Sequence, residues 1–324
     1  MCVTSFQVKI MSFSAGIAQI NPKLGEIEAN VALYEGKIRQ AKGDGMDFLV
    51  FPELSLTGYF LRDMVPNVAL SLTSSKVQHL KKLSRRFAFV AGMVEEGPDF
   101  RFYNSAVYFE GGEIRHVHRK VYLPTYGMFD EQRYFARGDR VRAFDSKFGR
   151  MGLLICEDLW HPSTVYLAAL DGALAIVCPS ASPLRGITEG HPQDDNARYW
   201  ELINRSYTET FSLYMIYGNR VGFEDGVGFW GGSEILDPFG NGLAKAKYYE
   251  EDMIAADVGL DAVRRKRTMS PLLRDEDLDL TINELIRIRE RPPGSQRRGA
   301  PAPAAAGKRS PGPKKQEKKN KKIK

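Results

Sequence analysis

The order of apolar and polar residues predicts a chain in which short strands alternate with amphipathic helices. Residues 13–20 alternate apolar and polar side chains, as a half-buried strand does, whereas Ile27, Val31, Tyr34 and Ile38 share one face of a helix. Short apolar runs bounded by turn residues predict further strands, some of them paired in hairpins. The predicted strands are 13–20, 47–51, 88–94, 104–110, 114–120, 151–155, 173–178 and 213–217, and the predicted helices are 27–42, 77–87, 165–171, 197–211 and 281–289.

Strand-then-helix units mixed with hairpins predict an α/β domain with mixed sheets. A further hairpin is predicted across 231–246, and the glycine-rich stretch 226–232 is predicted to be a loop near the rim of a pocket. Because no linker interrupts the chain before residue 290, we expect one domain over 14–290, preceded by an extension, 1–13, and followed by a tail, 291–324.

The tail accounts for the basic character of the chain. Residues 291–324 hold twelve Lys and Arg and a single acid, Glu317, so the tail has a net charge of +11 and the rest of the chain −5, against +6 for the whole. Its Pro, Gly, Ala and Lys residues bury no core, which predicts disorder. Its lysines predict weak, nonspecific contact with polyanions, since no aromatic residue lies among them to stack on bases.

The cysteines and histidines predict no disulfide and no metal. Cys2, Cys156 and Cys178 fit neither a disulfide framework nor a CxxC zinc site, and we expect a reducing, cytoplasmic compartment. His116 and His118 lie two apart on a predicted strand, but two histidines make a poor metal site. The N-terminus lacks the pattern of a signal peptide, and no stretch reaches about 18 consecutive apolar residues, so we expect no contact with membranes.

Reactive side chains stand at the ends of three predicted strands, where sheets of this class gather their sites. Glu53 follows the apolar run FLVFP, Lys120 closes a hairpin strand, and Cys156 ends the run MGLLIC. A thiol attacks a carbonyl as the thiolate, with Glu53 as the candidate base. Lys120 and the backbone N–H after the cysteine are candidates to stabilise the negative oxygen. Each residue also has an inert explanation (a capping carboxylate, a solvated lysine, a small core thiol), so the prediction depends on the combination.

The segments around these three residues resemble the nitrilase, or carbon–nitrogen hydrolase, superfamily. The blocks FPELSLTGY at 51–59, RKVYLP at 119–124 and GLLICED at 152–158 fit its glutamate, lysine and cysteine patterns in order and spacing. The resemblance runs over about 14–263. It implies a four-layer αββα sandwich that assembles as a homo-oligomer.

The same resemblance implies a triad in which Glu53 is the base, Lys120 stabilises the oxyanion and Cys156 is the nucleophile, without a cofactor. Many members of the superfamily have a second active-site glutamate after the lysine, and Glu131 is the candidate here. The alternative is an ion pair between Glu131 and Arg133.

Within the superfamily, the tracts KVYLPTYGMFDEQRYF and CEDLWHP and the segment PSASP at 179–183 are most similar to the glutaminase domain of glutamine-dependent NAD synthetases. In that branch a tyrosine that Tyr126 matches lines the site. The sequence has no SGGxDS-like pyrophosphate loop and no segment after residue 290 suited to a synthetase domain. We therefore expect either a stand-alone amidohydrolase or a subunit that supplies ammonia to a separate synthetase.

The residues after the cysteine bear on the substrate. Glu157 and Asp158 stand where nitrilases proper have Trp and Glu, which favours amides over nitriles. Either acid is a candidate to hold a substrate amine or to cap the segment after the cysteine. Trp160 is a candidate pocket wall or core aromatic, and Arg185 is a candidate to bind a substrate carboxylate or a surface residue. His161, which precedes a proline, is predicted to be structural.

We therefore expect an enzyme that hydrolyses linear amides through a Cys156 thioester and releases ammonia. N-carbamoyl amines and glutamine are both open as substrates, and an amine in place of water is open as acyl acceptor. A protein of a different class, which binds polyanions through its tail, is the alternative. The intact Glu53, Lys120 and Cys156 argue against a pseudoenzyme that serves only as a scaffold.

Overall fold

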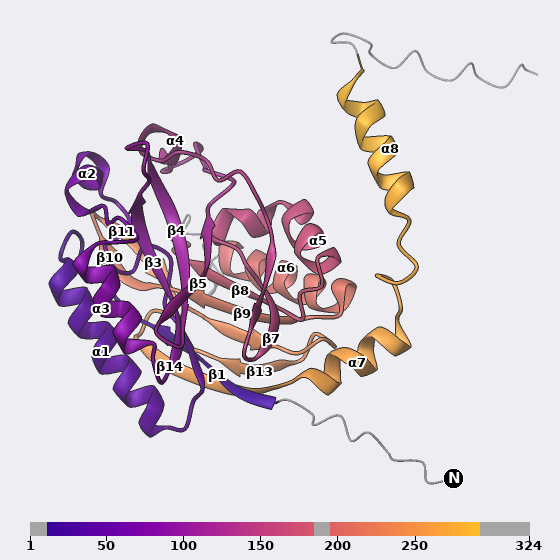
Figure 1. Ribbon diagram of the computed structural model, residues 1–324, viewed down its shortest axis with the longest axis horizontal. Coiled ribbons are helices and arrows are strands. Elements are labelled where there is room, and N and C mark those ends of the chain that lie inside the picture. Colours follow the sequence, from indigo (N-terminus) through magenta and orange to yellow (C-terminus); the bar gives the residue numbers. More distant parts are fainter. Residues whose placement is uncertain (1–11, 185–194, 292–324) are drawn as a thin grey trace, which may run out of the picture. The chain divides into compact units, whose positions relative to one another are not determined.

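The computed structural model describes residues 12–184 and 195–291. The chain divides into two units, Met1–Asp275 and Glu276–Lys324. The first unit contains two six-stranded sheets and a two-stranded sheet, with helices beside them (Figure 1). The described part of the second unit holds one helix, α8 (Leu278–Arg289), none of whose residues is buried. Within the described residues, no helix is both long enough and apolar enough to cross a membrane.

The first sheet has the strand order β14-β1-β2-β3-β4-β5. Strands β1, β2 and β3 are parallel to one another, and the other pairings are antiparallel. The bounds are β1 (Ser12–Gln19), β2 (Phe48–Val50), β3 (Ala88–Glu96), β4 (Phe102–Glu110), β5 (Glu113–Arg119) and β14 (Asp252–Gly259). The predicted hairpin of β4 and β5 is confirmed.

The second sheet has the order β13-β12-β9-β8-β7-β6, with β7, β8 and β9 parallel. The bounds are β6 (Ala143–Ser146), β7 (Gly149–Leu153), β8 (Ala175–Ser180), β9 (Tyr214–Asn219), β12 (Glu234–Leu236) and β13 (Gly242–Lys245). Strands β12 and β13 pair as the hairpin predicted across 231–246.

The alternation of side chains along β2 shows how the layers form. Phe48 and Val50 lie in the core between the two sheets, whereas Leu49 and Phe51 lie in a second core, which helices α1 (Ile27–Gly43) and α3 (Ser75–Leu83) cover. Because both faces of this strand are buried, its sequence is a continuous apolar run rather than an alternating one.

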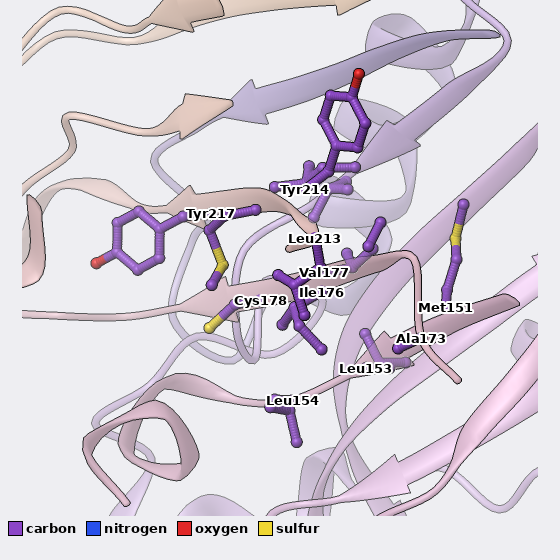
Figure 2. Close-up of a cluster of buried hydrophobic side chains, with 14 of the residues drawn as sticks. Met151, Leu153, Leu154, Ala173, Ile176, Val177, Cys178, Leu213, Tyr214 and Tyr217 are labelled. Carbon is purple, nitrogen blue, oxygen red and sulfur yellow. The ribbon is translucent and has the colours of Figure 1, made fainter. Parts of the chain in front are cut away.

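Helices also cover the outer face of the second sheet. Strands β7 to β9 contribute apolar side chains to the core, among them Leu153, Ile176 and Tyr217 (Figure 2). Trp200 of α6 (Asp195–Phe211) and Val165 of α5 (Pro162–Leu170) pack into the same cluster. The predicted four-layer αββα sandwich is therefore confirmed.

The prediction of a loop over 226–232 is wrong. Strands β10 (Val221–Glu224) and β11 (Val227–Trp230) form an antiparallel hairpin there. Asp225 and Gly226 both have positive φ, 50° and 80°, and such a pair makes the two-residue turn whose twist matches a hairpin. The Asp-Gly pair was the signal for this turn, and the flanking glycines concealed it.

The hydrophobic pattern predicted the longer elements but missed several shorter or more exposed ones. Strands β6 and β14 and the helix that follows β14 were not predicted. That helix is α7 (Leu260–Met269). The short helices that the pattern also missed are η1 (Arg62–Met64), α2 (Val65–Val68), α4 (Glu131–Tyr134) and η2 (Cys156–Trp160). Strand β14 is partly exposed along most of its length, so its apolar pattern is weak.

Candidate active site

Glu53 lies just beyond β2, buried between the ends of strands from both sheets. Its Oε1 accepts hydrogen bonds from Asn104 Nδ2 of β4 and from Lys120 Nζ, each at 2.7 Å. Its Oε2 accepts the backbone N–H of Ala181, just after β8, at 2.8 Å. The contact with Ala181 brings the ends of β2 and β8 together, so the two sheets meet at this carboxylate.

Lys120 directly follows β5, and its ammonium is buried among carboxylates. Its Nζ donates to Glu53 Oε1 and to Glu131 Oε1, both at 2.7 Å. Burial by itself would lower the pKa of Lys120, but the charges of Glu131 and Glu53 outweigh burial and raise that pKa well above its ordinary value. Lys120 therefore carries a fixed positive charge inside the protein.

Glu131 begins the short helix α4 and completes this charged cluster. Its Oε1 also accepts a hydrogen bond from the hydroxyl of Tyr59, and its Oε2 is buried without a hydrogen-bond partner among the described residues. Burial above all, and the charge of Glu53, raise the pKa of Glu131 to about 7 against the opposing effects of Lys120 and Tyr59. Of the two alternatives for Glu131, the structure forms the contact with Lys120 and not an ion pair with Arg133.

Cys156 is the first residue of η2 and stands at the sharp turn that follows β7. Its φ is +42°, a left-handed conformation that a side chain with a Cβ adopts only under strain, and such strain is typical of functional sites. Burial raises the pKa of the thiol well above its ordinary value, as does the charge of Glu53, whereas Lys120 and a hydrogen bond with Ser180 lower it. Cys156 therefore holds its proton and lies within the electrostatic reach of both charged residues.

The two acids that follow the cysteine have different surroundings. Asp158 is fully buried, and one of its oxygens accepts the N–H of Ile155 at 3.0 Å, which caps the segment after the cysteine. Glu157 instead accepts hydrogen bonds from the hydroxyl of Tyr126, at 3.0 Å on Oε1 and 2.9 Å on Oε2. Glu157 itself is buried, whereas Tyr126 is 42% exposed, so only the tyrosine of this pair reaches solvent.

The other predicted positions lie outside this cluster. Trp160 is partly buried; it stacks on Tyr199 at 4.4 Å between ring centroids and meets Trp200 edge-on, so it packs against α6. His161 stacks on Tyr122 at 3.5 Å, in line with a structural role. Arg185 lies outside the described residues.

The histidines of β5 have structural neighbours. His118 Nε2 is hydrogen-bonded to Asp158 Oδ2 at 2.8 Å, and His116 stacks on Phe144. Burial lowers the pKa of His116 to about 4. No group of three or more His, Cys, Asp or Glu suited to a metal ion occurs in the part of the chain that the structure describes.

The sequence patterns did not indicate Tyr59 or Asn104, which donate hydrogen bonds to Glu131 and Glu53. Tyr59 is the last residue of the FPELSLTGY block, so its place in the motif was a usable signal. The backbone N–H groups of Tyr59 and Phe60 donate to Glu224 of β10, which is also ion-paired to the buried Arg220. The hairpin of β10 and β11, which the sequence did not predict, therefore holds the backbone at Tyr59, whose hydroxyl contacts Glu131.

A cavity of about 580 Å³ lies against the Glu131 side of the cluster. Tyr59, Phe129 and Glu131 form part of its wall. Arg62 and Asp225, which are paired at 2.6 Å, also line it. The buried carboxylate is thus close to a space large enough for a small molecule.

Residues 14–268 match the carbon-nitrogen hydrolase family. The chain belongs to this family, a class of enzymes that hydrolyse carbon–nitrogen bonds. The matched range includes every residue of the cluster, so the family assignment and the geometry concern the same part of the chain.

Two curated relatives illustrate the range of the family. The chain is 33% identical over 265 residues to a glutamine-dependent NAD(+) synthetase of Thermotoga maritima, a match of 80% of this chain and 44% of the synthetase. It is 25% identical over 273 residues to the N-carbamoylputrescine amidase of Arabidopsis thaliana, 79% of this chain and 89% of the amidase. The chain thus spans less than half the length of this synthetase.

Solved structures agree with this assignment. The glutamine-dependent NAD+ synthetase of Acinetobacter baumannii superposes with a TM-score of 0.70 at 28% identity, over 78% of this chain and 47% of that one. A carbon-nitrogen hydrolase of Helicobacter pylori superposes with a TM-score of 0.72 at 26% identity, over 85% and 99% of the two chains.

Proposed function

We propose that the chain hydrolyses linear amides, with Cys156 as the nucleophile, Glu53 as the base and Lys120 as the cation that stabilises the oxyanion. The observation that carries this proposal is the buried ammonium of Lys120, held between two carboxylates beside a protonated thiol. A protein does not bury three charged groups together without compensation, and such clusters are typical of catalytic sites.

The proposed reaction has two halves. Cys156 Sγ attacks the amide carbon while Glu53 takes the thiol proton, which gives a tetrahedral oxyanion. The C–N bond then breaks, Glu53 returns the proton to the nitrogen, and ammonia leaves a thioester. Water attacks the thioester while Glu53 takes its proton, and the C–S bond breaks to give the acid and, after the proton returns to sulfur, the free thiol.

The contacts of Lys120 suit the role of oxyanion stabiliser. An ammonium has three N–H donors, and two of them are directed at Glu53 and Glu131. The third is available to the developing negative oxygen, together with the backbone N–H of Glu157. Because the carboxylates fix the ammonium in advance, little reorganisation accompanies the reaction.

Glu131 has a distinct role in this proposal. Its Oε1 orients Lys120, and its Oε2, which lacks a partner among the described residues, accepts an N–H of the substrate amide. A buried acceptor without a donor is costly, and a bound amide N–H removes that cost.

The test compares two buried cysteines. Ammonia release from a panel of amides should be lost in Cys156→Ala and kept in Cys178→Ala, since Cys178 lies in the core on β8. Mass spectrometry of the wild-type chain during turnover of a slow amide should show the acyl group on Cys156. Turnover by Cys156→Ala at the wild-type rate would contradict the proposal.

We infer further that the preferred amide carries an ammonium group, as glutamine does. Glu157 follows the nucleophile directly, and its carboxylate and the hydroxyl of Tyr126 are hydrogen-bonded at the partly exposed edge of the site. The relatives also favour glutamine as the substrate, since several of them are glutamine-dependent NAD(+) synthetases. The ammonia released would then be the substrate of a synthetase reaction.

Glu157→Gln tests the substrate assignment. It should raise KM for glutamine at least about tenfold, because a charge-assisted contact is lost, and leave KM for butyramide, which has no ammonium, within about twofold. Equal effects on both amides would contradict the role of Glu157.

N-carbamoyl amines are the second candidate, because the relative from Arabidopsis thaliana matches over 89% of its length. An N-carbamoyl diamine also carries an ammonium that suits Glu157. Glutamine and N-carbamoylputrescine in the same panel separate the two: the better substrate has the higher kcat/KM in the wild-type chain.

A further inference from the structure

One buried carboxylate connects the two segments that carry Lys120 and Cys156. Asp158 Oδ1 accepts the backbone N–H groups of Val121 and Tyr122, each at 3.0 Å, and these residues follow Lys120 directly. Asp158 Oδ2 accepts the N–H of Ile155 at 3.0 Å, the residue that precedes Cys156.

His118 also contacts this carboxylate. Its Nε2 lies 2.8 Å from Asp158 Oδ2, and both side chains are almost entirely buried. Lys120 lies two residues beyond His118, so three of the four contacts of Asp158 come from the end of β5 or from the residues just after it. The fourth comes from the segment between β7 and η2.

Strands β5 and β7 belong to different sheets, and sheets that pack face to face are held mainly by nondirectional apolar contacts. Directional hydrogen bonds between the two segments therefore determine where Lys120 stands relative to Cys156. A carboxylate with four donors has no remaining capacity for a substrate, which separates Asp158 from its neighbour Glu157.

We propose that Asp158 is a positioning residue that fixes the spacing between the Cys156 thiol and the Lys120 ammonium. This inference rests on the proposed function of those two residues. Asp158 acts on the reaction only through the backbone on either side of it, and it touches neither substrate nor the reacting atoms.

The ionisation of Asp158 agrees with this role. Burial raises its pKa, but the hydrogen bond with His118 and the N–H groups of Ile155 and Tyr122 outweigh burial and hold the pKa below the ordinary value. The side chain therefore stays a pure acceptor, as its four contacts require.

Asp158→Asn is the principal test. The amide keeps one oxygen for Val121 and Tyr122 but turns an NH₂ group toward the N–H of Ile155, where two donors repel. We expect kcat to fall about 100-fold, since a shift of about 1 Å in a reacting group has that effect, with KM changed less than about threefold. The rate of alkylation of Cys156 by iodoacetamide should fall in parallel.

Glu234→Gln is the matched control, because Glu234 of β12 is likewise buried and hydrogen-bonded, to Asn204 and Lys245, outside the cluster. Both variants should lower the melting temperature, but only Asp158→Asn should lower kcat per folded molecule. Equal kcat in the two variants would overturn the proposal.

A pair of substitutions at His118 keeps the test decisive where Asp158→Asn does not fold. His118→Gln retains a donor near the position of Nε2 and should keep most of kcat, whereas His118→Ala should lose about tenfold. If the contact between His118 and Asp158 served stability alone, kcat would be unchanged in both His118→Gln and His118→Ala. The proposed function and the role of Asp158 can fail separately. Activity in Cys156→Ala would contradict the proposed function. If Cys156→Ala were inactive but kcat were unchanged in Asp158→Asn and His118→Ala, only the role of Asp158 would be overturned.

Discussion

The two halves of the site are built in different ways. On the side of the first sheet, Glu53, Lys120 and Glu131 are buried charges that hold one another through short side-chain contacts. On the side of the second sheet, Cys156 is a neutral thiol placed by a strained backbone turn. The charged half should therefore be sensitive to the loss of any member, and the thiol half should tolerate loss of its side chain.

The difference has a physical reason. An ion pair in the interior is maintained by its partner, and removal of one member leaves the other charged and without solvent. A thiol has little solvation to lose, so its position depends on the backbone. The difference can be measured as the free energy of unfolding of single variants, in the order that follows.

Lys120→Met should have the largest effect. It leaves Glu53 and Glu131 facing each other without a cation, and we expect a loss of about 3–5 kcal/mol in the free energy of unfolding at pH 8. Urea unfolding monitored by circular dichroism measures it. A loss below about 1 kcal/mol would show that the charged half does not depend on its ammonium.

Tyr59→Phe should have an intermediate effect. It removes the hydroxyl that donates to Glu131 and should cost about 1–3 kcal/mol. Because that hydrogen bond lowers the pKa of Glu131, the pKa should rise above about 7 in the variant. The pKa of Glu131 can be followed as an inflection in the dependence of activity on pH. Tyr34→Phe is the control, because it removes another buried hydroxyl, which is hydrogen-bonded to Ser55. This variant should leave an inflection near pH 7 where it is in the wild type.

The pH dependence of stability gives the next effect. The pKa of Glu131 is raised from 4.5 to about 7, so the folded state holds a proton that the unfolded state releases. The resulting stabilisation is fully present below pH 4.5 and is lost as the pH rises through about 7. The unfolding free energy of Glu131→Gln should thus change less between pH 5 and pH 8 than that of the wild type, and an unchanged difference would argue against a raised pKa.

Substitutions of Cys156 should have the smallest effect on stability. Cys156→Ala should change the free energy of unfolding by about 1 kcal/mol or less. Cys156→Gly should be at least as stable as Cys156→Ala, because glycine adopts a φ of +42° without the strain that a Cβ imposes. If the glycine variant were less stable by more than about 1 kcal/mol, strain at this turn would be excluded. Thermal unfolding of the two variants side by side makes the comparison.

Sequence patterns predicted much of the fold because the local order of apolar residues reflects which faces of a strand or helix are buried. The run Phe48–Val50 is apolar throughout since both faces of β2 are covered, and the face of α1 that holds Val31, Tyr34 and Ile38 has helical spacing. The hairpin of β10 and β11 was missed although Asp225-Gly226 signals it, because the glycines on either side suggested a loop. Strand β14 was missed because its burial depends on pairing with β1, more than 200 residues earlier.

The sequence by itself determined the chemical groups of the candidate site, since Glu53, Lys120 and Cys156 stand in motifs of fixed spacing. Only the tertiary structure decided what surrounds them. Two adjacent acids, Glu157 and Asp158, look equivalent in the sequence, yet one is hydrogen-bonded to an exposed tyrosine and the other is sealed between two sheets. The reason is that a side chain's chemistry is local, whereas its solvation and its partners depend on segments that only folding brings together.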